Sequence, residues 1–255
     1  MPITAEIYYF THSKAGADSP PVVLIHGAGG SHLHWPSEVR RLPGYRTYAL
    51  DLPGHGKSTG RGLQSIAAYA DAVIHWLEAV DLHRAIMVGH SMGGAIVQYL
   101  ALHAKDQVLG LGLVGTGARL RVHPDILQNT LSEKTYRTAV DTVVRWAFSP
   151  QTPPQLVEIA SRRMAETRPS VLHGDFVASD AFDIIDQVSE IDQPTVVICG
   201  ADDQLTPLRY SQFLTDNMPN AQLEVIPAAG HMVMLEKPQE VAGILGAFMA
   251  KIKFL

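Results

Sequence analysis

The sequence predicts an α/β fold with a mostly parallel central sheet and helices on both faces. Along most of the 255 residues, short apolar segments alternate with segments of helical periodicity. The segments 22–25 (VVLI) and 46–50 (RTYAL) are apolar runs typical of strands buried on both faces. The alternation stops after Gly117 and resumes at Pro194, which indicates an insertion between two strands.

The elements before the insertion follow one another in the order that a parallel sheet requires. An opening strand is expected near 7–10, and the strand at 46–50 ends in the turn 51–54 (DLPG). A helix is expected over about 63–80, because apolar residues recur there at helical spacing. Further strands are predicted at 84–88 and 109–114, with a helix between them, and at 195–198 and 223–226, followed by a last helix.

The segment 118–189 shows helical patterns and no convincing buried strand. Within 132–148 the apolar face consists of Tyr136, Val140, Val143, Val144 and Ala147. We therefore expect a core of 1–117 and 190–255 with a helical cap, 118–189, over the site. The alternative is a set of helices that only packs on the edge of the sheet. The cap is favoured because its two attachment points flank strands that end near Ser91.

Composition narrows the class of protein. Apolar residues make up 46% of the chain and charged residues 18%, and the net charge is −5, which does not favour a nucleic-acid partner. One cysteine allows no internal disulfide. No signal peptide is recognised, and the longest apolar stretch, about 108–118, is too short to span a bilayer. We expect a cytoplasmic protein without a membrane partner, either a monomer or a homodimer.

The most informative motif lies at 87–94 (MVGHSMGG), where Ser91 stands inside Gly-x-Ser-x-Gly between a strand pattern and a helix pattern. Such a strand-to-helix turn exposes a nucleophilic serine. Gly89 and Gly93 remove the side chains that would collide in so tight a turn. Ser91 is therefore the candidate nucleophile.

A serine hydroxyl needs a base to take its proton, and a third group must orient that base. His231 follows the strand pattern 223–226, so it can reach a site at the carboxyl end of the sheet. Asp202 and Asp203 both follow the strand pattern 195–198, and the residues alone leave either as the orienting acid. The chain order is then Ser, Asp, His.

Five segments together resemble the α/β-hydrolase superfamily over nearly the whole chain, and in particular its serine esterases with a helical cap. They are 26–30 (HGAGG), 51–58 (DLPGHGKS), 89–94 (GHSMGG), 200–207 (GADDQLTP) and 230–231 (GH). The resemblance implies that Asp203, four residues before Pro207, is the acid. It also implies that the backbone N–H groups of Ala28 and Met92 form the oxyanion hole.

Candidate pocket residues are Gly29, Trp146, Phe148, Leu205 and Val233, for which ordinary core packing is an equal alternative. His32 and His34 form a His-x-His pair, but the companion pattern of metallohydrolases is missing and no metal site is expected. The glycines of 26–30 match neither nucleotide-binding pattern.

The expected function is hydrolysis of a carboxylic ester of a small to medium acyl group through an acyl-enzyme, with a small-molecule ester as substrate and no cofactor or metal. Alternatives on the same triad are a C–C bond hydrolase, a lactonase or a perhydrolase, since the fold does not choose among them. An alternative of another class is a ligand receptor or signalling protein that hydrolyses its ligand slowly.

Overall fold

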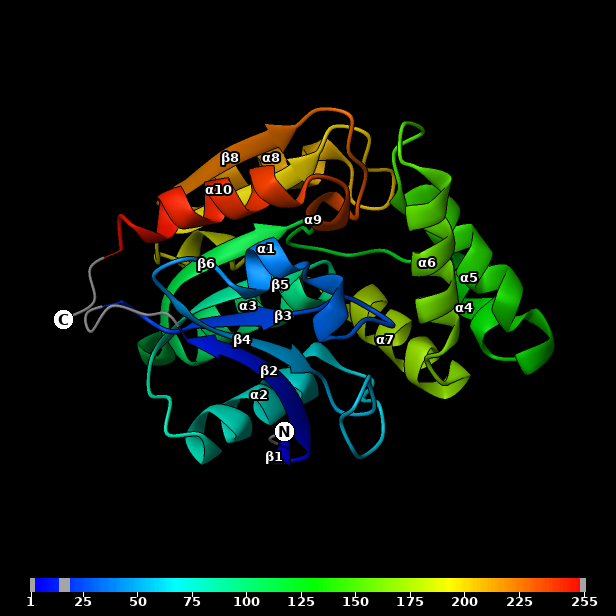
Figure 1. Cartoon of the computed structure of the whole chain (residues 1–255), viewed down its shortest axis with the longest axis horizontal. Helices are drawn as coiled ribbons and strands as arrows, with labels where there is room; N and C mark the ends of the chain where they lie inside the picture. Colours follow the sequence, from blue (N-terminus) through cyan, green and yellow to red (C-terminus); the bar gives the residue numbers. More distant parts are fainter. Residues whose placement is uncertain (1–2, 14–18, 253–255) are drawn as a thin grey trace.

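An eight-stranded sheet organises the described residues, 3–13 and 19–252, of the computed structural model. Its strand order is β1-β2-β4-β3-β5-β6-β7-β8 (Figure 1). The strands are β1 (Ile3–Thr4), β2 (Ile7–Ser13), β3 (Val22–Ile25), β4 (Arg46–Asp51), β5 (Ala85–His90), β6 (Val108–Val114), β7 (Thr195–Gly200) and β8 (Ala221–Ile226).

The sheet is parallel from β4 to β8, and the first two strands form an antiparallel hairpin on one edge. The prediction of a mostly parallel sheet is confirmed. The opening strand is longer than expected, because β2 pairs with β4 from Tyr8↔Asp51 to Ser13↔Arg46. β1 was not predicted, since two residues carry no recognisable strand pattern.

Helices cover both faces of the sheet, as predicted. The longer ones outside the β6–β7 connection are α2 (Ile66–Ala79), α3 (Met92–His103), α8 (Leu208–Asn217) and α10 (Pro238–Met249). Short helices are α1 (Ser37–Arg40), α9 (Val233–Glu236) and the 3₁₀ turns η1 (His32–His34), η2 (Lys105–Gln107) and η3 (Val188–Glu190).

Alternate residues of β3 show how the sheet separates two hydrophobic cores. Val23 and Ile25 belong to the cluster that contains the buried residues of α2 and α3. Val22 and Leu24 belong to the cluster that contains those of α1 and α10. Because successive strand side chains point to opposite faces, a strand between two cores must be apolar throughout.

Helix α2 begins later than its apolar periodicity suggested, at Ile66 rather than near Leu63. Ser65 fixes this boundary, because its extended backbone and its hydroxyl, which accepts from Ala68 N at 3.2 Å, cap the first turn. Leu63 lies before the cap, and its N–H donates to the Tyr69 hydroxyl at 3.0 Å.

Four helices lie between β6 and β7, where the sequence predicted an insertion: α4 (Pro124–Thr130), α5 (Glu133–Ala147), α6 (Pro154–Ala165) and α7 (Pro169–Ala181). They gather on the side of the molecule toward which β3, β6 and β8 point (Figure 1). The five residues of the predicted stripe on α5 are all buried. We propose that this segment is a cap. The strands β6 and β7 are adjacent, and the chain leaves the sheet after β6 and re-enters it at β7.

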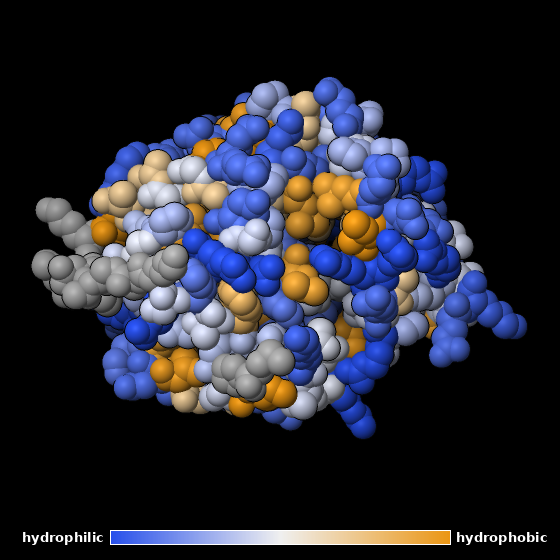
Figure 2. Space-filling view, viewed as in Figure 1, coloured by the Kyte–Doolittle hydropathy of each residue, from blue (hydrophilic) through white to orange (hydrophobic). Residues whose placement is uncertain are grey.

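The surface in the same view is largely hydrophilic, with apolar residues gathered where the sheet meets the cap helices (Figure 2). Across residues 3–13 and 19–252, no helix combines the length and the apolar character that crossing a membrane requires.

The close packing of α3 against β3 generates a test of the fold. A Cβ added at Gly93 would lie 2.3 Å from Ile25 O, whereas one added at Gly243 in α10 meets nothing within 4 Å. We expect Gly93→Ala to lower the free energy of unfolding by about 3 kcal/mol or more through overpacking. Gly243→Ala, the same change at an exposed position of a helix, should raise it by about 0.5–1 kcal/mol. Urea unfolding of both variants checks this, and equal effects would contradict the packing argument.

Candidate active site

The candidate nucleophile lies at the turn from β5 to α3, in a backbone conformation that few residues adopt. Ser91 has φ 53° and ψ −117°, a region that is strained for any residue with a side chain. Backbone bonds hold it there: Ser91 N donates to Val114 O at 3.0 Å, and Ser91 O accepts from Ala95 N at 3.2 Å. The Thr116 hydroxyl also donates to Ser91 O, at 2.9 Å.

Two glycines allow the turn, as the motif predicted. A Cβ at Gly89 would lie 2.1 Å from Gly93 O, closer than any real contact. The loop after β3 also passes against the serine, because a Cβ at Gly27 would lie 3.0 Å from Ser91 Cβ. The backbone that follows β3 therefore approaches the candidate nucleophile directly.

The predicted base and acid are in contact. His231 Nδ1 lies 2.9 Å from Asp203 Oδ2, and both side chains are almost fully buried. Since a carboxylate oxygen accepts, Nδ1 must carry a proton and donate it. That tautomer leaves Nε2 of His231 as the nitrogen able to take a proton from a nucleophile.

Hydrogen-bond donors to both carboxylate oxygens stabilise the anionic form of Asp203. Its Oδ1 accepts from the backbone N–H groups of Leu205 at 2.9 Å and Thr206 at 2.8 Å, and Oδ2 accepts from the Thr206 hydroxyl at 2.8 Å. Burial is the largest influence and raises the pKa of Asp203, but His231 and the hydrogen bonds from Thr206 outweigh it and leave that pKa below its ordinary value.

The other candidate acid points elsewhere. Asp202 Oδ2 accepts from the Ser149 hydroxyl at 2.6 Å, and Asp202 N donates to Ala229 O at 2.8 Å. Of the two adjacent aspartates, Asp203 is therefore the one that the structure brings to His231.

The loop that carries His231 is fixed by the cap and by β5. Met232 N donates to Ala147 O at 3.0 Å, and Gly230 N donates to Glu236 Oε1 at 2.8 Å. His90, next to the nucleophile, donates a hydrogen bond from its Nε2 to His231 O at 3.0 Å. Burial lowers the pKa of His90 well below its ordinary value, so His90 is a neutral packing residue.

The two residues predicted to donate to an oxyanion come from the start of α3 and from the loop after β3. Met92 is the first residue of α3 and is fully buried, and the N–H of a first helical residue has no partner inside its own helix. Ala28 follows Gly27 and lines the same cavity as Ser91 and His231.

That cavity has a volume of about 420 Å³ and lies between the cap and the carboxyl ends of the strands. Of the predicted pocket residues, Trp146 and Leu205 line it. Phe148 and Val233 instead belong to the buried cluster on the α1–α10 side of the sheet. Gly29 lines a separate polar cavity next to η1. These last three positions differ from the prediction because spacing along the chain fixes neither the direction of a side chain nor the path of a loop.

Several lining residues were not singled out from the sequence. Val143 stood on the predicted apolar stripe of α5, and Thr206 stands three residues after an aspartate, a spacing typical of side-chain-capped turns. The other unpredicted residues of the cavity wall are Leu120, Arg121, Val122, His123, Pro124, Ile126, Phe176, Ser179 and Gln204. Most come from the cap and the segment leading into it, where no motif marks a binding role.

The two histidines of the His-x-His pair lie in different surroundings, and among the described residues His34 Nδ1 is buried without a hydrogen-bond partner. His32 Nδ1 lies 2.8 Å from Asp51 Oδ1, and burial lowers the pKa of His34 to about 4. Within the described part of the chain, no group of three or more His, Cys, Asp or Glu side chains is arranged to hold a metal ion.

Known proteins resemble this chain over most of its length. Residues 20–238 match the family model described as the alpha/beta hydrolase fold. A solved structure described as a thermophilic esterase is 34% identical, with a TM-score of 0.80, and the match covers 96% of this chain and 98% of that one.

Two curated relatives cover most of the chain. The pimeloyl-[acyl-carrier protein] methyl ester esterase of Pectobacterium carotovorum is 29% identical over 92% of this chain and 94% of its own length. The dihydrolipoyllysine-residue acetyltransferase component of the acetoin cleaving system of Pseudomonas putida is 28% identical over 92% of this chain. The chain spans only 65% of that acetyltransferase component.

The depressed pKa of Asp203 predicts a pH dependence of stability. A carboxyl whose folded pKa lies below its ordinary value of 3.8 stabilises the fold above that pH, and the contribution is lost as pH falls through the folded pKa. We expect the difference in free energy of unfolding between the native chain and Asp203→Asn to be present at about pH 5 and to shrink as the pH falls below 3.8.

Urea unfolding at a series of pH values measures this difference. Asp141→Asn, on α5, removes a carboxylate that is 51% exposed and controls for the loss of one negative charge. A difference for Asp203→Asn that stays unchanged to the lowest pH would contradict the assignment of Asp203 as a buried anion.

Proposed function

Because the chain belongs to the α/β-hydrolase family, we propose that this enzyme is a serine hydrolase cleaving carboxylic esters through an acyl-enzyme intermediate. The observation that carries the proposal is the His231–Asp203 hydrogen bond, 2.9 Å long, beside a cavity lined by both Ser91 and His231. In this proposal, three separate loops supply the nucleophile, the base and the orienting acid.

The proposed reaction proceeds in two steps that use only these groups and water. Ser91 Oγ attacks the ester carbonyl carbon while His231 Nε2 takes the hydroxyl proton. His231 then returns that proton to the departing alkoxide, and the acyl group remains on Ser91. Water, activated by the same histidine, attacks the acyl-enzyme and releases the carboxylic acid.

Asp203 and the backbone stabilise the charges that appear during these steps. The anionic Asp203 holds the tautomer of His231 and stabilises the imidazolium that forms. The N–H groups of Ala28 and Met92 receive the developing negative charge on the carbonyl oxygen. Removing one such donor costs about 10²–10³ in kcat in other serine hydrolases.

The cavity supports an acyl group of small to medium size. Its volume of about 420 Å³ lies toward the lower end of ligand pockets, which hold roughly 300–1,000 Å³. Apolar side chains of the cap, including Val143, Trp146 and Phe176, form part of its wall. An acyl chain has no hydrogen-bonding groups to satisfy, so it suits that wall.

We expect Ser91→Ala and His231→Ala to lose turnover of a short-chain p-nitrophenyl ester while remaining folded. The expected loss is about 10⁶-fold, as found for another serine hydrolase lacking one of these groups. Continuous measurement of p-nitrophenol release gives the rates. Ser37→Ala, an exposed serine on α1, is the matched control and should keep full activity.

The time course separates this function from a receptor role. An esterase releases many equivalents of p-nitrophenol at a steady rate, whereas a receptor that hydrolyses its ligand once stalls after about one equivalent. Steady release that survives in Ser91→Ala would refute the assignment of the nucleophile.

A further inference from the structure

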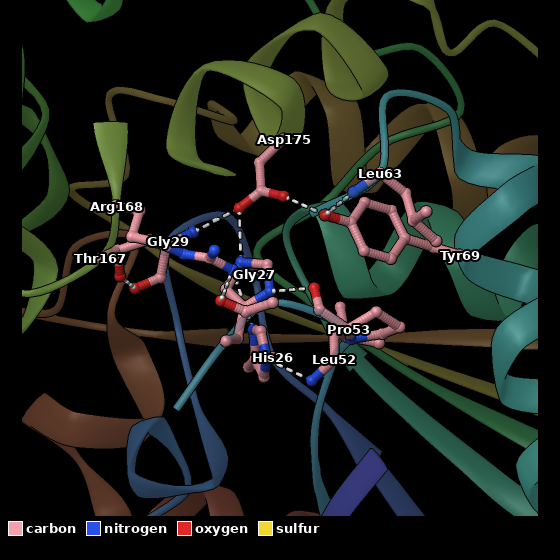
Figure 3. Close-up of polar contacts among 12 residues, drawn as sticks. His26, Gly27, Gly29, Leu52, Pro53, Leu63, Tyr69, Thr167, Arg168 and Asp175 are labelled. Carbon is pink, nitrogen blue, oxygen red and sulfur yellow. Dashed lines mark hydrogen bonds and ion pairs between the residues drawn. The ribbon is translucent and has the colours of Figure 1, made fainter. Parts of the chain in front are cut away.

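A buried carboxylate on the cap contacts the backbone beside the proposed oxyanion hole. Asp175, on α7, is fully buried and accepts from Gly29 N at 2.8 Å and from the Tyr69 hydroxyl at 2.5 Å. Its Oδ2 also lies 2.8 Å from His55 Nε2. Figure 3 shows the carboxylate of Asp175 directed at the loop of Gly27 and Gly29 on one side and at Tyr69 on the other.

The charge of Asp175 is balanced inside the protein. Both ring nitrogens of His55 face acceptors, the Asp175 carboxylate and Pro53 O at 3.1 Å, so both nitrogens donate and the ring is an imidazolium. Burial is the largest influence and lowers the pKa of His55, but the Asp175 carboxylate and its hydrogen bond outweigh it and raise that pKa. Asp175 thus forms a buried, hydrogen-bonded ion pair rather than an isolated charge.

Both peptide groups of Gly29 are held by the cap. Its N–H donates to Asp175, and its carbonyl accepts from the Thr167 hydroxyl at 3.0 Å. Gly29 has φ 63°, and a Cβ added there would lie 2.7 Å from Leu172 Cδ1, on the same helix as Asp175. Only glycine fits this position, and the cap fixes its orientation.

The peptide group between Gly27 and Ala28 is held by hydrogen bonds from His26 and Gly30. Gly27 O accepts from His26 Nδ1 at 2.7 Å and from Gly30 N at 3.1 Å. His26 Nε2 accepts from Leu52 N at 3.0 Å, which places the ring proton on Nδ1. Burial lowers the pKa of His26 well below its ordinary value, so this link is a neutral one.

These bonds define the direction of one N–H group. Ala28 lies between a peptide fixed by His26 and a peptide fixed by Asp175, so neither of its backbone dihedrals can change without breaking one of the two contacts. We infer that Asp175 is a positioning residue that aims the Ala28 N–H at the developing oxyanion. The inference rests on the proposed function, in which that N–H stabilises the transition state.

Replacing Asp175 should change kcat and KM to different extents. An oxyanion donor must lie about 2.7–3.1 Å from the oxygen of the tetrahedral intermediate, and a misplacement of about 1 Å can cost up to about 100-fold in rate. A substrate in the ground state makes little use of this donor. Loss of Asp175 should therefore lower kcat and leave KM nearly unchanged.

The first test is Asp175→Asn, which keeps the shape of the side chain and removes its charge. We expect kcat on the p-nitrophenyl ester to fall about 10- to 100-fold, with KM within about 3-fold. Affinity for a trifluoromethyl ketone, which adds to Ser91 as a tetrahedral oxyanion, should fall by the same factor. Affinity for the product carboxylate should not change, and Asp141→Asn, the control on α5, should match the native chain in every measurement.

Two variants of Thr167 test the same inference if Asp175→Asn does not fold. Thr167→Val removes only the hydroxyl that donates to Gly29 O and leaves the ion pair intact. We expect it to lower kcat and ketone affinity together, by about 3- to 10-fold, the effect of one hydrogen bond. Thr167→Ser keeps the hydroxyl and should restore both.

The outcomes separate this inference from the proposed function. Native kcat and ketone affinity in folded Asp175→Asn, or in Thr167→Val, would overturn the positioning role while Ser91→Ala remains inactive. A loss confined to KM, or equal losses for ketone and product carboxylate, would also overturn it, because both indicate a general change of the pocket. Activity that survives in Ser91→Ala would overturn the proposed function and, with it, the inference.

Discussion

The close approach of three backbone segments around Ser91 is the constraint on which the rest of the site depends. A Cβ at Gly89 would collide with Gly93 O, one at Gly93 with Ile25 O, and one at Gly27 with the side chain of Ser91. The end of β3, the turn after β5 and the start of α3 therefore pass one another without intervening side chains. This proximity brings Ala28 into the wall of the cavity that Ser91 lines, as the proposed role of its N–H group requires.

The same pairing of aspartate and histidine serves two different purposes in this protein. In Asp203–His231 the carboxylate occupies only Nδ1, and the histidine lines a cavity where Nε2 can exchange a proton. In Asp175–His55 both ring nitrogens are already bound to acceptors. A histidine with both nitrogens occupied cannot act as a base, so the first pair suits catalysis and the second suits the fixing of loops.

The cap is joined to the loops of the proposed site by several hydrogen bonds. Ala147 O, at the end of α5, accepts from the N–H next to His231, and Asp175 of α7 accepts from Gly29 N. A cap with such anchors forms part of the site as well as its cover. In the proposed site, the wall of the cavity and the direction of the Ala28 N–H both depend on the cap, which would link substrate fit to the geometry of the reaction.

The sequence by itself determined the order of strands and helices, the parallel sheet, and the turn that exposes Ser91, because apolar periodicity and glycine spacing are local properties of the chain. It also indicated His231 and, through the family resemblance, Asp203, and the tertiary structure brought this residue rather than Asp202 to that histidine. Phe148 and Val233 lie in the core and do not line the cavity, since side-chain direction depends on packing. No motif marked Asp175 in the sequence. Its contact with Gly29 joins residues 146 positions apart, and only the folded chain brings such residues together.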